Sequence, residues 1–505
     1  MPRRSTIAII LVLFVANALY YYWIMARTFV IPSIDGPFYY IQVNSILHTG
    51  TIVYQDPPLT FYVFTLFTLA ARNTVVGVMA GSAAFAAAAS VAVYMLFKRM
   101  FKSNVPAIAA AVVCALSAEH IAMATNVMKN SFGVVFIVGA IFFLQRILDA
   151  DKPAKWNVVG AVGFFLLAMF THVLDQGIVL IFMAFYLVLS LLFADRRKLL
   201  FRYGTILLLA IGVSVAGFLL LPEYFGTFQK GLDFLSIVSA SGATASNAGG
   251  VGAGVAVYDP LLYVTLILGV ALSVYEWFRG DRKKLVLLVS ATAVGILLVL
   301  PFIPSDFAWR FELMELIPVS IITGYAFAAI RGKEELLTAL AVLVLIVPVA
   351  VVGFQSGTTL TPSISQQAYA DLVHMSTLVS TNHAVLLVNA AGANSEYWPE
   401  YVLNLQVVSN STTWLQKGYT VYELVGGQSQ GGAQNTLNGG FGGGPNGSNP
   451  GAPGQQNNIP GTPGGGAPTN GATGNQNAET LNLTNATLVY SGNTYTLYKL
   501  GNSTK

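Results

Sequence analysis

The sequence contains few charged residues and a single cysteine. Only 10% of its 505 residues are Asp, Glu, Lys or Arg, and 55% are apolar, whereas about a quarter of the residues of a soluble protein carry charge. This composition excludes an ordinary soluble fold. It also argues against a nucleic-acid partner, because no basic stripe coincides with a soluble module. Cys114 lies in an apolar segment and has no second cysteine to pair with, so any outer domain must fold without an intrachain disulfide.

Long apolar stretches take the place of charge in the first 353 residues. They lie at 5–25, 75–97, 105–119, 131–147, 157–171, 176–193, 204–221, 260–277, 285–302, 311–329 and 336–353. Stretches of about this length cross a bilayer as helices, so we expect a polytopic α-helical membrane domain with about 11 transmembrane helices over residues 1–353. The first stretch is interpreted as a retained helix, because its apolar core is too long for a signal peptide and no small-residue cleavage site follows.

The distribution of Lys and Arg predicts the orientation. Most of the 26 basic residues fall in every second loop, and basic loops remain in the cytoplasm. We therefore expect a multi-pass protein of the cell membrane with its N-terminus in the cytoplasm and its C-terminal part outside.

One apolar segment, 58–71, does not fit the alternation of loops. It is too short to span a bilayer, and a span here would move the basic residues after position 97 to the outside. We expect a juxtamembrane or re-entrant helix that belongs to a long first outer loop, 26–73, where irregular backbone is buried in protein.

Residues 354–505 have the periodicity of a small extracytoplasmic α/β domain. A helix is expected at 364–380 and strands at 384–389, 405–408 and 419–424, and a Ser-Gly-Asn turn at 491–493 joins two alternating runs as a hairpin. The Gly/Asn/Pro-rich tract 427–478 has too few large apolar residues to form a core, so we expect a disordered loop inserted between strands.

The outer region also carries all the acceptor sequences for N-glycosylation. They begin at Asn410, Asn446, Asn482, Asn485 and Asn502. Their position after residue 400 agrees with the predicted outer side, although the abundance of Asn, Ser and Thr there offers a compositional explanation.

Asp35 is a candidate catalytic residue because it lies among apolar and aromatic residues directly after the first helix. A carboxylate in such surroundings has a raised pKa and can act as a general base. The alternative is a helix N-cap, since Gly36 and Pro37 follow and proline fits the first helical turn.

The whole first outer loop resembles that of the GT-C glycosyltransferases. The residues that carry the resemblance are Asp35, the pair Tyr39 and Tyr40, the segment Ile46-Leu-His-Thr-Gly50, the segment Tyr54-Gln-Asp-Pro-Pro-Leu59, and Arg72. Within that superfamily the loop is most similar to the protein O-mannosyltransferase and aminoarabinose-transferase branch, whose members use polyprenyl-phosphate sugars.

The resemblance implies a membrane glycosyltransferase that moves a sugar from a polyprenyl (dolichyl) phosphate donor to a protein, glycan or lipid acceptor on the outer face. It implies that Asp35 acts as the base in an inverting single displacement. Contacts to sugar or acceptor are expected from Tyr39, Tyr40, Asp56, His172 and Asp175. Because Gly36 stands where many relatives have a second acid, we expect neither a metal site nor a cofactor.

The leaving lipid phosphate needs cationic donors, preferably arginine. The candidates at the outer membrane surface are Arg310, Lys129 and Arg72. Each has a structural alternative, because each can be an interfacial anchor. Arg310 can also be an ion-pair partner of Glu312 or Glu315. His172 has a structural alternative too, as a helix-end histidine.

Two other functions remain open from the sequence. A transporter or flippase of lipid-linked sugars would also be polytopic, although no span shows paired intramembrane charges or broken-helix repeats. A non-catalytic surface scaffold would tolerate the loss of Asp35.

Overall fold

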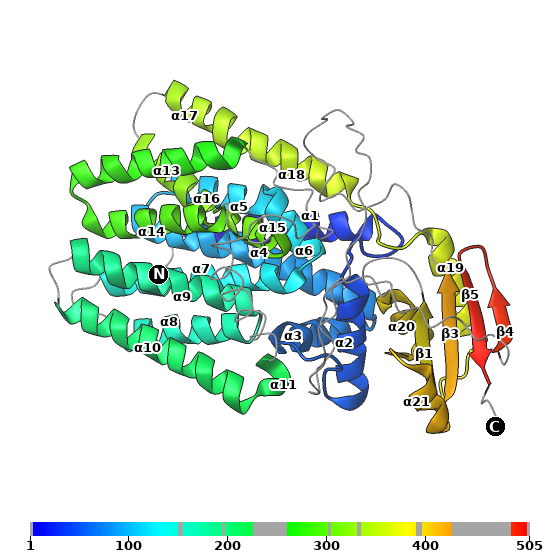
Figure 1. Ribbon diagram of the computed structural model, residues 1–505. Coiled ribbons are helices and arrows are strands. Elements are labelled where there is room, and N and C mark those ends of the chain that lie inside the picture. The colour runs from blue at the N-terminus through cyan, green and yellow to red at the C-terminus, as the bar shows by residue number, and fades with distance from the viewer. Residues whose placement is uncertain are drawn as a thin grey trace, which may run out of the picture.

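The computed structural model describes residues 4–149, 155–193, 197–225, 260–300, 303, 305–330, 335–389, 396–426 and 486–501. A bundle of long helices forms most of the molecule, and a small mixed sheet lies beyond one end of it (Figure 1). Helix α2 lies between the two, across the direction of the bundle helices. The first outer loop therefore separates the membrane part from the outer domain.

Most helices of the bundle occupy the positions that hydropathy predicts, whereas α6, α11 and most of α15 are not predicted. The helices of the bundle are α1 (Arg4–Ala26), α4 (Thr74–Phe101), α5 (Val105–Leu116), α6 (Ala118–Thr125), α7 (Met128–Asp149), α8 (Lys155–Met169), α9 (Val173–Phe193), α10 (Arg197–Leu220), α13 (Pro260–Arg279), α14 (Arg282–Leu298), α15 (Ser305–Met314), α16 (Leu316–Ile330), α17 (Glu335–Ala341) and α18 (Val347–Thr359), with a short α11 (Pro222–Phe225) after α10. The prediction of a polytopic helical membrane protein is confirmed.

Eight helices of the described chain are long and apolar enough to cross a membrane, or nine if the bent pair α5–α6 counts as one. Helices α8 and α14 lie at two further predicted positions but have only 15 and 17 residues. The total of about 11 spans, each of which needs about 20 apolar residues, stays a prediction. Many large side chains of α10 and α13 are exposed, with Leu220 75% and Phe278 83% exposed, as expected for helices with one face in contact with lipid.

Two predicted spans are irregular, each for a local reason. Helices α5 and α6 meet at an angle of 51°, where Ser117 ends the first helix and caps the second through its hydroxyl oxygen. A π-helical turn, η1 (Val342–Ile346), joins α17 to α18 just before Pro348. Proline has no backbone N–H to donate, so the regular hydrogen-bond ladder is interrupted there.

The first outer loop forms two helices, α2 (Gly36–Thr49) and α3 (Leu59–Ala71). Helix α3 has 13 residues, so the predicted short helix at 58–71 is present. Its first backbone N–H donates to the carbonyl of Phe170 at 3.0 Å, which attaches it to the end of α8.

The outer domain contains α19 (Gln366–Ser376), β1 (Ala384–Asn389), α20 (Tyr397–Leu403), β2 (Gln406–Val408), α21 (Ser411–Gln416), β3 (Thr420–Gly426), β4 (Ala486–Ser491) and β5 (Tyr495–Leu500). The strand order is β2-β1-β3-β5-β4, with β1 parallel to β2 and β3 and with β5 antiparallel to β3 and β4. The predicted small sheet is therefore confirmed. The aromatic segment that begins at Tyr397 forms the short helix α20.

Only one predicted glycosylation site can be placed. Asn410 is exposed and caps α21, its side-chain oxygen accepting from the backbone of Thr412 at 2.8 Å and of Thr413 at 3.3 Å. Asn446, Asn482, Asn485 and Asn502, and the predicted loop 427–478, lie outside the described residues. Use of these sites stays a prediction.

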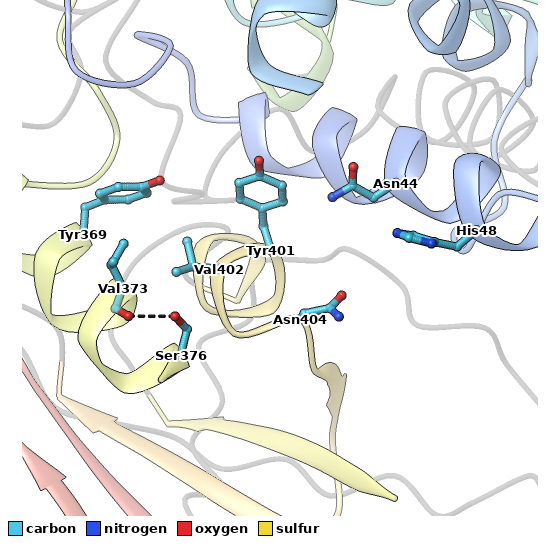
Figure 2. Close-up of a pocket in the computed structure, with 8 residues that line it drawn as sticks. All are labelled: Asn44, His48, Tyr369, Val373, Ser376, Tyr401, Val402 and Asn404. Carbon is cyan, nitrogen blue, oxygen red and sulfur yellow. Dashed lines mark hydrogen bonds between the residues drawn. The ribbon is translucent and has the colours of Figure 1, made fainter. Parts of the chain in front are cut away.

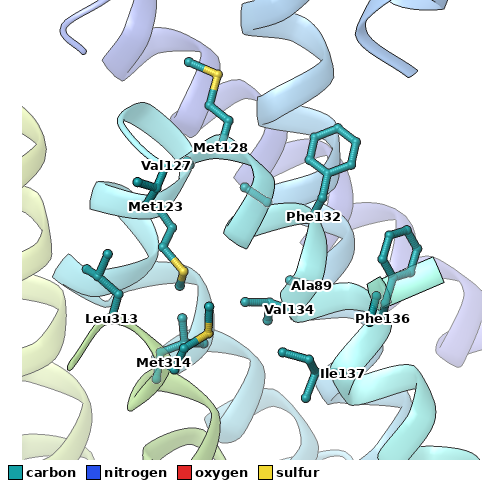
Figure 3. Packing of buried hydrophobic residues seen from close by; sticks show 14 of the residues in the cluster. Ala89, Met123, Val127, Met128, Phe132, Val134, Phe136, Ile137, Leu313 and Met314 are labelled. Atoms are coloured by element: carbon teal, nitrogen blue, oxygen red, sulfur yellow. The ribbon is translucent and has the colours of Figure 1, made fainter. Parts of the chain in front are cut away.

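A continuous apolar core supports the end of the bundle that faces the outer domain. Met123 of α6 points toward Leu313 and Met314 of α15, and all three are buried (Figure 3). Phe132 of α7 stacks on Phe85 with ring centroids 3.7 Å apart. This packing fixes the start of α7, which carries Lys129, and helix α15, which carries Arg310.

Candidate active site

Asp35 occupies the turn between α1 and α2. It is the N-cap residue of α2, but its side chain makes no capping hydrogen bond, so capping does not account for the carboxylate. The turn requires glycine at the next position, because a Cβ on Gly36 would lie 2.4 Å from the Ile31 side chain. The neighbouring backbone is fixed as well, since the N–H of Ile34 donates to Asn126 at 3.1 Å.

A buried ion pair lies beside this turn. The Lys129 Nζ atom, at the start of α7, contacts Oδ2 of Asp56, and the two side chains are only 14% and 5% exposed. Lys129 also lies over the rings of Phe38 and Phe61, 5.7 and 5.9 Å from their centroids. The other carboxylate oxygen of Asp56 is buried without a hydrogen-bond partner in the described part of the chain, so it can still accept one.

Tyr39 connects α2 to this pair. Its hydroxyl accepts from the backbone N–H of Lys129 at 3.3 Å, and its ring packs on Phe61 and Phe64 at 5.8 and 5.7 Å. Burial raises the pKa of Tyr39 well above its usual value, and the charge of Asp35 raises it further. Tyr39 is therefore a neutral hydroxyl beside the charged groups.

The electrostatic surroundings of Asp35 join three parts of the chain. Burial raises the pKa of its carboxyl, while the cations Lys129 and Arg310 oppose this and Asp56 adds to it. Arg310 lies on α15, is exposed, and places its guanidinium 5.1 Å from the ring of Trp309. A carboxylate and two cations from distant positions in the sequence therefore share one site.

A second polar group follows directly on α7. The amide of Asn130 donates to Asp175 Oδ1 at 3.2 Å and contacts His172 Nδ1 at 3.1 Å. The N–H of Leu174 also points at His172 Nδ1, at 3.3 Å, so this nitrogen accepts hydrogen bonds and the ring proton is on Nε2. A Cβ on Gly133 would lie 2.0 Å from the Asp175 carboxylate, so only glycine leaves room for it.

Two of the predicted site residues lie elsewhere. Arg72 ends α3 in the left-handed conformation with φ 54° and is exposed, at the opposite end of that helix from the Asp56 segment. Tyr40 points toward the outer domain, where its ring meets Tyr401 at 5.0 Å and Trp398 at 6.3 Å. The structure thus brings together Asp35, Tyr39, Asp56, Lys129 and Arg310, and places His172 and Asp175 next to them.

Glu315 does not pair with Arg310. Both of its carboxylate oxygens are buried without a hydrogen-bond partner among the described residues. The Arg310–Glu315 ion pair, one of the structural alternatives for Arg310, is therefore not formed.

The outer domain touches the loop that carries Asp56. The Tyr54 hydroxyl donates to Glu400 on α20, and the side chain of Gln42 on α2 holds the backbone of Val53 and Tyr54 through bonds of 2.8 to 3.2 Å. Burial raises the pKa of Glu400 to about 7, with Glu396 adding to the effect and the Tyr54 hydroxyl opposing it. The position of Asp56 is thus coupled to a titratable group of the outer domain.

Sequence reasoning misses Asn130 and Glu400. The only sequence signal for Asn130 is its position after Lys129 at the start of a helix, and this is a weak indication of a polar site. Glu400 follows the aromatic run at Tyr397, and its role depends on a contact 346 residues away in the sequence. Across the described chain, no three His, Cys, Asp or Glu side chains are grouped so as to hold a metal ion.

Residues 55–219 match the family model described as dolichyl-phosphate-mannose-protein mannosyltransferase. The matched region is about a third of the chain and contains Asp56, Lys129 and Asp175, but neither Asp35 nor Arg310. A search of curated proteins gives no match.

Solved structures extend the likeness to the whole chain. The archaeal oligosaccharyltransferase AglB from Archaeoglobus fulgidus, in complex with an inhibitory peptide and a dolichol-phosphate, has a TM-score of 0.57 at 13% identity, over 84% of this chain and 70% of that one. ArnT from Cupriavidus metallidurans in the apo state has a TM-score of 0.51 at 12% identity, over 97% of each chain. The chain has the fold of the GT-C membrane glycosyltransferases. The predicted likeness to this superfamily is confirmed at the level of the fold.

Within the GT-C fold of this chain, the charged site lies at the end of the bundle that faces the outer domain. The segments after α1 and after α18 meet there, since the Arg27 guanidinium donates to the carbonyl of Leu360 at 2.6 Å. The first outer loop and the outer domain are therefore on the same side of the membrane.

Proposed function

We propose that the protein is a glycosyltransferase that moves a sugar from a polyprenyl phosphate carrier, such as dolichyl phosphate, to an acceptor on the outer face of the cell membrane. The observation that carries the proposal is the position of Asp35, whose carboxyl interacts with both Lys129 and Arg310. A base and two cations are the groups that this reaction requires.

Asp35 acts as the general base. The acceptor hydroxyl attacks the anomeric carbon of the sugar, its proton passes to Asp35, and the bond from that carbon to the phosphate oxygen breaks. One displacement forms the new glycosidic bond with inversion and releases the lipid phosphate. Burial makes Asp35 a stronger base, and the two nearby cations favour the ionised form that can accept a proton.

Lys129 and Arg310 stabilise the departing phosphate. Arg310 offers a planar set of N–H donors that matches phosphate oxygens, and Lys129 adds a point charge held in place by Asp56. Fixed cations near the developing charge lower the barrier without the reorganisation that water needs. We infer that transfer needs no metal ion, because these side chains supply positive charge where the phosphate leaves.

The remaining polar residues orient the substrates. Tyr39 is a neutral hydroxyl next to Lys129, and the free oxygen of Asp56 can accept a bond from a sugar hydroxyl. His172 and Asp175, joined through Asn130, extend this group of polar side chains to the start of α9.

The orientation follows from the charge pattern of the loops. The N-terminus is placed in the cytoplasm, and the charged site and the outer domain are placed outside. Glycans on Asn410 and on the other sequons would then lie on the same side as the site.

Transfer from a synthetic lipid donor tests the proposed function. The purified protein in lipid nanodiscs is incubated with a short-chain dolichyl-phosphate mannose and, separately, with an undecaprenyl-phosphate sugar, and with a panel of hydroxyl acceptors. Product with the anomeric configuration opposite to that of the donor, determined by NMR, is expected. Retention would contradict single displacement. Movement of donor across liposomes without transfer would favour a flippase, and neither activity would favour a scaffold.

A further inference from the structure

A cleft lies at the other end of α2 from Asp35. It has a volume of about 410 Å³ and lies between the C-terminal half of α2 and helices α19 and α20 of the outer domain (Figure 2). Asn44 and His48 come from α2, Tyr369 and Ser376 from α19, and Tyr401 from α20, which Asn404 follows directly. No Asp, Glu, Lys or Arg is among the residues that line it.

Three tyrosine side chains meet at the inner side of this cleft. Tyr369 and Tyr401 line it, and the hydroxyl of Tyr401 points toward α2 (Figure 2). Tyr40, on α2, packs its fully buried ring against Tyr401, with the ring centroids 5.0 Å apart. Tyr40 is not among the residues that line the cleft. It therefore supports the aromatic side of the cleft, and Tyr369 and Tyr401 are the tyrosines that can contact a ligand.

The tyrosines are neutral donors. Burial raises the pKa of Tyr40 well above its usual value and that of Tyr401 to about 12. The amide of Asn44 is held by Thr74, whose hydroxyl donates to Asn44 Oδ1 at 2.8 Å, so the NH₂ group is the part of this side chain that can donate to a ligand.

We propose that this cleft binds a neutral carbohydrate. Flat aromatic rings pack against the C–H faces of sugar rings, and amides, hydroxyls and an imidazole match the sugar hydroxyls as donors and acceptors. The lining has no Lys or Arg to pair with a phosphate and no Asp or Glu to pair with a basic peptide, which separates this cleft from the charged site at Asp35. The volume is that of a small-ligand site and suits a mono- or disaccharide.

The cleft is joined to the charged site by helix α2 and by a chain of contacts through the outer domain. Asp35 and Asn44 are nine residues apart, which corresponds to about 14 Å along a helix. Trp398 of α20 contacts Tyr369 and Tyr40 and donates to Ser363 at 2.9 Å, and Ser363 donates to the carbonyl of Ser33 at 2.8 Å. If the proposed function holds, the sugar bound here is part of the acceptor. The binding of a carbohydrate in the cleft does not depend on that function.

Direct binding of disaccharides tests the proposal. The full-length protein in detergent is titrated with α-1,2-mannobiose, cellobiose and chitobiose, each up to about 10 mM, and binding is followed by calorimetry and saturation-transfer NMR. At least one of the three is expected to bind with a Kd of about 1 mM or below. Absence of binding by all three would overturn the proposal.

Variants then locate the binding site. Tyr369→Phe and Asn44→Ala each remove only part of one side chain and are expected to weaken binding about tenfold. Tyr62→Phe is the matched control, because Tyr62 lies outside the cleft and donates to the carbonyl of Gly50 at 3.0 Å. Binding that is unchanged in the first two variants would place the sugar elsewhere and contradict the proposal.

The Asp35→Asn variant separates this proposal from the proposed function. Disaccharide binding is expected to persist in it. Transfer by the wild type without binding would overturn the cleft alone, and binding without any transfer would overturn the proposed function alone.

Discussion

The two ends of α2 present opposite chemistry. At its N-terminal end, Asp35 lies among Lys129, Arg310 and Asp56, and these groups come from the first outer loop, α7 and α15. At its C-terminal end, the cleft is lined by amides, tyrosines and a histidine from α2 and the outer domain. The charged groups lie at the proposed site of bond breaking. The neutral polar groups lie at the proposed site of sugar recognition.

One short helix thus separates two tasks. Fixed charges in a partly buried site act strongly on a developing charge, but they would bind many anions without discrimination. A neutral cleft has little long-range attraction and discriminates through hydrogen-bond geometry. Placing the two about 14 Å apart on a helix keeps both in one rigid frame.

The largest expected effect comes from breaking the ion pair at the charged end. Lys129→Met leaves Asp56 as a buried, uncompensated charge and should lower the free energy of unfolding by about 3 kcal/mol, seen as a lower Tm. Lys129→Met combined with Asp56→Asn should recover most of this stability without restoring donor binding. Equal instability in the double variant would contradict the buried pair.

Removing the second cation should affect the donor and leave the cleft unchanged. Arg310→Ala loses a charge-assisted contact to the lipid phosphate, so the Kd for the lipid donor should rise about 10- to 100-fold. Arg72→Ala is the control, because Arg72 lies at the far end of α3, and its donor Kd should change less than about twofold. Similar losses in the two variants would mean that general surface charge attracts the donor.

A glycine substitution tests how far the charged end extends along α7. Gly133→Ala places a methyl group against the Asp175 carboxylate, so the Asn130 bond should break and stability should fall by about 1–3 kcal/mol. Gly177→Ala on the same helix as Asp175 meets no atom within 4 Å and should leave the Tm unchanged or slightly higher. Reduced transfer in Gly133→Ala at a temperature where it stays folded would assign Asp175 to the site.

The smallest effect concerns the contact between the outer domain and the Asp56 loop. Glu400 has an ordinary pKa of 4.5 and a folded pKa of about 7, so the stability of the folded contact falls as the pH rises from about 4.5 to about 7 and stays low above that. Hydrogen exchange of residues 51–57 should be a few-fold faster at pH 8 than at pH 6, after correction for intrinsic rates.

Glu400→Gln provides the matched variant for this contact. It cannot ionise, so the pH dependence of exchange in residues 51–57 should disappear while the Tyr54 contact is kept. A pH dependence equal to that of the wild type would assign the effect to another group.

Hydropathy and local pattern predict most of the fold. Most helices lie at the predicted positions, and the short segment 58–71 forms α3 because it has the wrong length and flanks for a span. Strands β1, β3 and the hairpin β4–β5 follow from alternation and turn residues. The break between α5 and α6 is not predicted, because it depends on how Ser117 caps the second helix.

The site is only partly predictable for a physical reason. Asp35, Asp56 and Lys129 are found because charged residues near the outer ends of apolar helices are rare. The direction in which Tyr40 points, the role of Asn130 and the Glu400 contact depend on packing between segments up to 346 residues apart, which local patterns do not encode.

The most direct test is the single-turnover rate of sugar transfer in Asp35→Asn at saturating lipid donor, with the donor Kd measured separately. Asp281→Asn is the control, because Asp281 lies near Lys283 and Asp149 at the other end of α7. Asp35→Asn is expected to lower the rate by about 10²- to 10⁴-fold with little change in donor Kd, and Asp281→Asn is expected to transfer at the wild-type rate. Equal transfer rates in Asp35→Asn and the wild type would contradict the assignment of Asp35 as the base.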